Sequence, residues 1–156
     1  AFYLDQIYTG SATIEPFIPV SQKLTILGKL RYRRSSIPNG SVNFDNNDYI
    51  GGFIPNLTNS LEYYGAKPKE YMASNYLYGR GGIQYEVMNK LFAGLHYNFL
   101  YAHANDDEPV FSGKNFRHGF AASVGYASPI GPLKVFLAKD PHRNSWEASL
   151  AVGFYY

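Results

Sequence analysis

The carboxy-terminal segment constrains the fold of this chain more than any other part of it. From Ser145 to Tyr156, apolar or aromatic residues alternate with small or polar ones; the apolar set is Trp146, Ala148, Leu150, Val152, Phe154 and Tyr156. Successive side chains of a β-strand point to opposite faces of a sheet. This spacing therefore predicts a strand with one apolar face and one small or polar face.

The same alternation recurs along the chain between segments rich in Gly and Pro. Such punctuated, period-two patterns are typical of strands, and no segment shows the spacing of an amphipathic helix. Several of the predicted strands have about 10 residues or more, the length that a tilted strand needs to cross a bilayer. We predict strands at residues 2–18, 23–34, 47–56, 71–88, 91–103, 118–128, 132–139 and 145–156.

The composition agrees with a strand protein that faces both lipid and water, but it also fits a soluble all-β protein, the commoner class. Aromatic residues make up 17% of the chain, with 15 Tyr and 11 Phe, whereas the mean hydropathy is -0.27. No apolar run reaches the ~18 to 20 residues of a transmembrane helix. We therefore predict an all-β fold, an antiparallel transmembrane β-barrel with roughly eight strands in these residues.

The connections between the predicted strands differ in length. Those at 88–90 and 128–132 are short, whereas those at 56–69 and 104–117 are long and polar. Transmembrane barrels place short turns on the periplasmic side and long loops outside. Counted back from a periplasmic carboxy-terminus, this arrangement puts the long loops outside and residues 35–45 on the periplasmic side.

Several kinds of chemistry have no candidate residues here. The chain has no Cys, which excludes disulfides and thiolate sites, and its net charge of +2 is too small to indicate nucleic-acid binding. The four His residues lack the spacing of a zinc site. A Gly-x-Ser-x-Gly nucleophile elbow is absent as well. We expect no catalytic residue, no cofactor and no metal, and hence no enzymatic activity in these residues.

Charged residues are predicted on the inward face of two strands. Lys29, Arg31 and Arg33 share one strand face, and Glu15 lies on the preceding strand. Opposite charges inside a barrel pair across strands, so we expect structural ion pairs. Arg80 and Glu86 invite the same interpretation, and a constriction selective for anions is the alternative.

From Asp48 onward, the chain resembles the carboxy-terminal part of an Omp85-superfamily outer-membrane barrel, and most closely the patatin-like (type Vd) branch. Residues 49–53 resemble the glycine pair that leads into the long sixth loop, and residues 63–65 stand where that loop turns back. Residues 126–133 resemble the short penultimate turn. The sixth-loop-like motif comprises Gly51, Gly52, Phe53, Tyr64 and Gly65. Family members that insert or secrete proteins carry an Arg at this loop tip, and residues 63–65 have none.

The resemblance implies a role for the whole chain. Residues 1–156 would form one barrel domain, the second half of a sixteen-stranded barrel that is an anchor or translocator for a patatin-like or other periplasmic or surface domain. Any lipase activity would lie in a domain absent from this sequence. The rest of the barrel would belong to the same chain or to another one.

The resemblance also implies location and partners. The protein would lie in the outer membrane of a Gram-negative bacterium, in contact with membrane lipid and lipopolysaccharide. The barrel-assembly machinery would read the last strand as a signal, carried by Trp146, Leu150, Val152, Phe154 and Tyr156.

Two other interpretations fit the same alternation. One is a complete small outer-membrane barrel of about eight strands, with a structural or adhesive role. The other is a soluble ligand-binding β-barrel, which would line its cavity with apolar residues and carry its charges outside.

Overall fold

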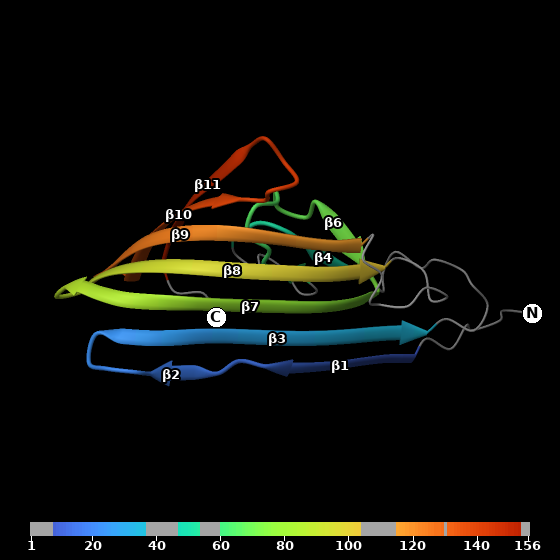
Figure 1. Ribbon diagram of the computed structural model, residues 1–156, viewed down its shortest axis with the longest axis horizontal. Coiled ribbons are helices and arrows are strands. Elements are labelled where there is room, and N and C mark those ends of the chain that lie inside the picture. The colour runs from blue at the N-terminus through green and yellow to red at the C-terminus, as the bar shows by residue number, and fades with distance from the viewer. Residues whose placement is uncertain (1–7, 37–46, 54–59, 104–114, 130, 154–156) are drawn as a thin grey trace, which may run out of the picture.

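The computed structural model describes residues 8–36, 47–53, 60–103, 115–129 and 131–153. They form two sheets, an eight-stranded main sheet and a three-stranded inner sheet (Figure 1). The strands of the main sheet are β1 (Tyr8–Ile14), β2 (Phe17–Pro19), β3 (Leu24–Ser36), β7 (Asn75–Met88), β8 (Leu91–His103), β9 (Phe116–Ser128), β10 (Gly131–Lys139) and β11 (Trp146–Val152). Those of the inner sheet are β4 (Asp48–Ile50), β5 (Ser60–Leu61) and β6 (Tyr71–Ala73).

The main sheet is antiparallel throughout. Its order is β1-β3-β7-β8-β9-β10-β11, and β2 follows β1 along the same partner, β3. The prediction of an all-β antiparallel fold is therefore confirmed. Strands β1 and β11 stand at the two ends of this order and do not pair with each other, so the described residues form an open sheet.

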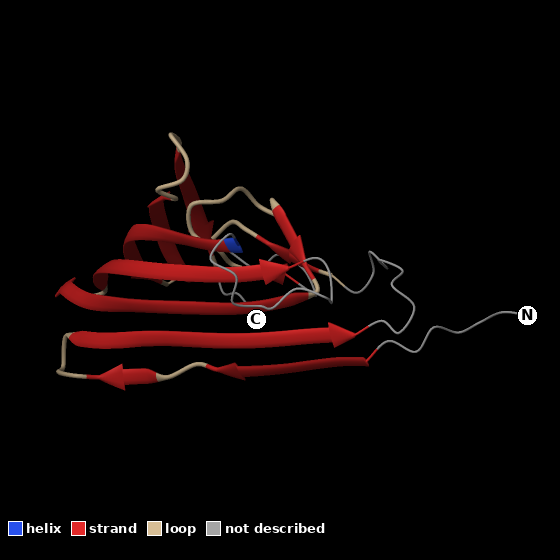
Figure 2. Cartoon of the chain, turned by 45° about the vertical axis from the view of Figure 1, so that its right-hand side comes forward, coloured by secondary structure: helices blue, strands red, loops and turns tan. Residues whose placement is uncertain are grey.

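Strands make up almost all of the regular structure (Figure 2). Within the described residues, no helix has the length and apolar character required to cross a membrane.

The two faces of the main sheet differ in chemistry. The outer face carries large apolar side chains that are exposed over strand after strand: Ile26, Leu30, Tyr32, Ile83, Tyr85, Leu95, Tyr97, Phe120, Val124, Val135, Leu137, Trp146, Leu150 and Val152. The other face, here called the inner face, is the one against which the inner sheet packs. Its residues include Tyr76, Tyr78, Leu100 and Ala138, which are all fully or nearly fully buried.

The described residues within 47–74, here called the excursion, lie outside the main sheet, here called the wall. Because β3 pairs directly with β7, the chain leaves the main sheet after Ser36 and returns to it at Asn75, at the same end of the sheet. Within the excursion, β4 pairs with β5 and β6. The side chains of Ile50, Leu61 and Tyr63 are buried against Tyr76 and Leu100 of the wall, forming one core cluster.

Three predictions about this region are wrong. Residues 47–53 are not a strand of the wall, because the strand in this described part of the predicted range 47–56 is Asp48–Ile50 and it pairs within the inner sheet. The predicted strand 71–88 is two strands, since the chain bends at Ser74 between the inner sheet and the wall. The predicted periplasmic placement of residues 35–45 fails at its described start, because Ser35 and Ser36 end β3 at the end of the sheet where β7 begins; residues 37–45 lie outside the described residues.

Two glycines follow directly after β4, which the sequence predicted to continue to residue 56. Gly51 and Gly52 have φ values of 138° and 79°, which other residues rarely adopt. A Cβ at Gly51 would collide with the carbonyl oxygen of Lys67. The excursion therefore turns at this pair and folds over itself.

Candidate functional site on the inner face

A fully buried carboxylate fixes the first strand of the excursion to the wall. Asp48 on β4 has no exposed surface, and its carboxylate accepts hydrogen bonds from Arg33 and from the hydroxyl of Tyr76. Arg31 lies on the same face of β3, with Nη2 3.2 Å from Oδ2 of Asp48. A buried charge is tolerated only with such partners, so this cluster constrains where β4 can lie.

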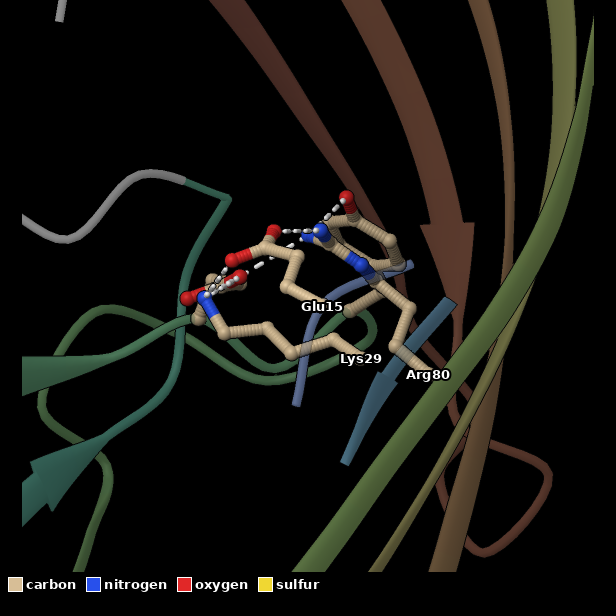
Figure 3. A network of polar contacts seen from close by, with 5 residues as sticks. Glu15, Lys29 and Arg80 are labelled. Carbon is tan, nitrogen blue, oxygen red and sulfur yellow. Dashed lines mark hydrogen bonds and ion pairs between the residues drawn. The ribbon is translucent and has the colours of Figure 1, made fainter. Parts of the chain in front are cut away.

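A second carboxylate, Glu62, follows β5 and contacts two cations of the wall. Its Oε1 lies 3.0 Å from Nζ of Lys29 and 2.8 Å from Nη1 of Arg80. Glu15, which lies between β1 and β2, contacts the same cations, at 3.6 Å from Lys29 and 3.2 Å from Arg80. Figure 3 shows Glu15, Lys29 and Arg80 converging in this four-residue network.

The tip of the excursion, Tyr63–Gly65, packs on the opposite part of the wall. The ring of Tyr64 lies within 5.7 Å of the rings of Phe53 and Phe136 and 5.4 Å from that of His96. Gly65 has a φ of 98°, and a Cβ there would lie 2.5 Å from the amide nitrogen of Asp140. Only glycine fits this approach without displacing the backbone after β10.

A glycine of the wall accommodates the same turn. A Cβ at Gly119 of β9 would collide with the carbonyl oxygen of Tyr64. The tip therefore meets β9 backbone to backbone, and the absence of a side chain at Gly119 allows this contact.

Burial keeps the tyrosines of the tip neutral. It raises the pKa of Tyr63 far above the usual value near 10, and the nearby Asp140 raises it further. Burial also raises the pKa of Tyr64, an effect that Arg80 partly opposes. The Tyr64 hydroxyl accepts a hydrogen bond from Arg80 at 3.2 Å, which joins the tip to the Glu62 network.

Further contacts hold the end of the excursion to the far side of the wall. Glu70 pairs with Arg143, between β10 and β11, at 2.7 Å. The guanidinium of Arg117 on β9 stacks over the Tyr71 ring at 4.6 Å. The excursion is thus attached to β3 and β7 on one side and to the β9–β11 region on the other.

The structure brings together most of the charged residues singled out in the sequence. Lys29, Arg31, Arg33 and Arg80 all pair with carboxylates on the inner face. Arg80 does not pair with Glu86, whose carboxylate accepts a hydrogen bond from the amide of Lys90. The physical reason is position: Glu86 lies six residues farther along β7, near the opposite end of the sheet.

The residues of the last strand lie on the outer face. Trp146, Leu150 and Val152 of β11 are each more than half exposed. Phe154 and Tyr156, also predicted to belong to the assembly signal, lie outside the described residues. Nothing in the geometry tests that signal.

The acidic half of the site was not predicted from the sequence. Asp48, Glu62 and Glu70 lie on the excursion, and each pairs with a cation of the wall or of a connecting segment. The sequence did hold a signal for it. The inward face of β3 carries three cations, and Glu15 alone could not neutralise them, so further acids were to be expected nearby. In the part of the chain that the structure describes, no three His, Asp or Glu residues converge as metal ligands.

Comparisons with known proteins bear on the whole arrangement. A family model described as OMP85 superfamily matches residues 17–156. No curated protein matches the sequence.

Proposed function

The chain belongs to the OMP85 superfamily, and from this premise we propose that it is a non-enzymatic wall segment of an outer-membrane β-barrel. Membership suggests an outer-membrane β-barrel role in a Gram-negative bacterium. The finer proposal is that these residues are the carboxy-terminal half of a larger barrel. That barrel anchors or translocates a patatin-like or other periplasmic or surface domain.

The difference between the two faces of the main sheet carries this proposal. Exposed Leu, Ile, Val and aromatic side chains cover the outer face, whereas paired Lys, Arg, Asp and Glu lie on the inner face. Lipid accepts the first surface, and a wet or plugged lumen accepts the second. A soluble ligand-binding barrel needs the opposite arrangement, with its charges outside.

Strand direction supports a wall completed by other strands. Because β1 and β2 both pair with β3, the eight strands occupy seven places across the main sheet, and each place is antiparallel to the next. The first and seventh strands, β1 and β11, therefore run in the same direction. If these strands closed on each other, the seam would be parallel, unlike the antiparallel seams of outer-membrane barrels. An odd number of further strands is needed. This argues against the small barrel formed from these residues alone.

A second copy of the same seven positions does not remove this difficulty. Two copies that face the same way in a membrane would place β11 of one beside β1 of the other, again in parallel. The sixteen-stranded barrel that the resemblance implies would add an odd number of strands to these seven, so every pair of neighbouring strands could be antiparallel.

The contacts of the excursion with the inner face of the main sheet support the same proposal. Its acids neutralise four cations of the wall, and its apolar side chains bury Tyr76, Tyr78 and Leu100. We propose that it occupies the lumen and holds the wall strands in place, in the position of the family's sixth loop. It does so with acids, where other members use an Arg at the loop tip.

Engineered disulfides test how the wall closes, because the 156 residues contain no Cys. We expect no disulfide between Ala12→Cys on β1 and Ala148→Cys on β11 in the full-length protein in its membrane. Leu137→Cys with Ala148→Cys is the positive control, since these two residues are register partners. An efficient Ala12–Ala148 cross-link within one chain would overturn the proposal.

The mass and detergent requirement of the native protein test the rest. We expect a detergent-dependent polypeptide much longer than these residues, with its attached domain released by proteolysis of the link between them. A protein that stays soluble without detergent would contradict the membrane role.

A further inference from the structure

The outer face carries an aromatic and basic patch that runs from the middle of β8 to the point where β10 ends and β11 begins. The strand registers align Tyr97 with Phe120, Phe120 with Lys139, and Lys139 with Trp146, in a row across β8, β9, β10 and β11. The outer-rim patch is defined as these four residues with His118 and His142. Lys139 is the last residue of β10, so the patch lies where β10 ends.

Ring contacts make the outer-rim patch continuous. Tyr97 lies 5.2 Å from Phe120 and 5.9 Å from His118, measured between ring centroids. His118 lies 5.4 Å from His142, which belongs to the connection between β10 and β11. The Lys139 ammonium lies 5.3 Å from the Trp146 ring centre. One cation and two imidazoles are thus embedded among aromatic rings.

The charge of Lys139 has no acidic partner in the part of the chain that the structure describes. Its contact there is the cation–π contact with Trp146, whereas Lys29 and Arg80 on the inner face each pair with two carboxylates. The outward positions of the main-sheet strands carry no Asp or Glu among the described residues. Arg34, near the same end of β3, also faces outward and is exposed.

The location of Lys139 limits what can surround it. A Lys on the lipid face is strongly destabilising at the bilayer midplane but costs little near an interface. Tyr and Trp favour that interface, because one end of the ring system is apolar and the other is polar. The patch therefore matches the boundary between acyl chains and headgroups, where the available counter-charge is phosphate.

We propose that the outer-rim patch binds the anionic phosphate of membrane lipid headgroups, with Lys139 as the cation that pairs with it. His118 and His142 donate hydrogen bonds to the phosphate oxygens, and Trp146 and Phe120 contact the upper acyl region. This inference rests on the proposed membrane function and deepens it. It assigns a lipid class and a binding site to one end of the wall.

Trp146 is a natural reporter for this site, because it is the single Trp of the 156 residues. The full-length protein, with any Trp elsewhere replaced by Phe, is placed in phosphatidylcholine vesicles. These contain a fixed fraction of brominated phosphatidylglycerol or of brominated phosphatidylcholine. Bromine quenches Trp fluorescence at short range, so the ratio of quenching by the two lipids reports which headgroup gathers at Trp146.

We expect the anionic lipid to be enriched about fivefold at Trp146, as one interfacial cation supports, and the enrichment to fall towards one in Lys139→Gln. Lys139→Arg is expected to keep it. Lys23→Gln is the matched control at the opposite end of the sheet, where Lys23 precedes β3 and is exposed. Heat-modified migration on gels checks that each variant is folded.

The outcomes separate this inference from the function on which it rests. Equal quenching by both lipids in the unmodified protein overturns the phosphate site and leaves the membrane wall in place. Enrichment that persists in Lys139→Gln also overturns it. Absence of quenching by either lipid means that protein covers the patch, and the membrane location of this face fails with it.

Discussion

Asp48 and Glu62 perform the same task in the excursion but in different surroundings. Both are nearly or fully buried, and each lies between two cations of the wall. Lys29 and Arg80 also contact Glu15, so the cations around Glu62 have a second carboxylate. Within the described residues, Arg31 pairs with Asp48 alone. Loss of the Asp48 charge therefore removes the carboxylate partner of Arg31 among the described residues, whereas loss of the Glu62 charge leaves Lys29 and Arg80 paired with Glu15.

The largest effect is expected from Asp48→Asn. This change removes the fully buried carboxylate that contacts Arg31 and Arg33, and breaking a buried pair in this way costs about 3–5 kcal/mol. The free energy of unfolding in urea, measured on detergent-folded protein, reports the loss. A cost below that of Glu62→Gln would contradict the proposed difference between the two sites.

Glu62→Gln is expected to cost less, about 1–2 kcal/mol, because Glu15 still neutralises Lys29 and Arg80. The same urea measurement applies. Glu62→Asp is the matched control, since it keeps the charge and shortens the side chain by one methylene. If Glu62→Gln proves as costly as Asp48→Asn, Glu15 does not serve as a second counter-ion.

Glu15→Gln alone is expected to cost less than about 1 kcal/mol, because the Glu15 side chain is 37% exposed and water screens its pairs. The double variant Glu15→Gln with Glu62→Gln sharpens the comparison. We expect its cost to exceed the sum of the two single costs, since both cations then lose every carboxylate. Simple additivity in the cycle would mean that the two acids act independently.

The smallest effect near neutral pH is expected from the tyrosines at the tip. Burial raises the pKa of Tyr64 in the folded protein, so its contribution to stability is complete below the usual phenol pKa near 10. That contribution falls as the pH rises above 10, because the unfolded chain ionises first. Urea midpoints at pH 8, 10 and 11 should therefore decrease, and less steeply in Tyr64→Phe than in the unmodified protein.

The wall of the fold was predictable from sequence because its signal is local. Period-two alternation predicted β3, β8, β9 and β10 to within a few residues, and it put Leu95, Val135 and Leu150 on the apolar face. Each of these strands has one face that is predominantly apolar over most of its length. Local pattern is sufficient in such a case.

The excursion was not predictable in the same way, because its strands are defined by distant partners. Asp48–Ile50 is three residues long, and nothing in those residues indicates whether they pair with the wall or with Tyr71–Ala73. The destination of Asp48 depends on cations more than ten residues away on β3. The pairing of Lys29 with Glu15 was anticipated from their shared face, whereas the roles of Asp48 and Glu62 were not.

The direct pairing of β3 with β7 has a consequence for the order of folding. Strand β7 reaches β8 through a two-residue turn, but it meets β3 only after the chain has closed the long connection between Ser36 and Asn75. Closing a long loop delays such a contact, so we expect β3 to pair with β7 after the β7–β8 hairpin has formed. A one-residue slip in this pairing would turn Lys29, Arg31 and Arg33 towards the apolar outer face of the main sheet. Asp48 and Glu62 therefore favour the native register of β3, because their ion pairs with β3 form in that register and not in the neighbouring ones.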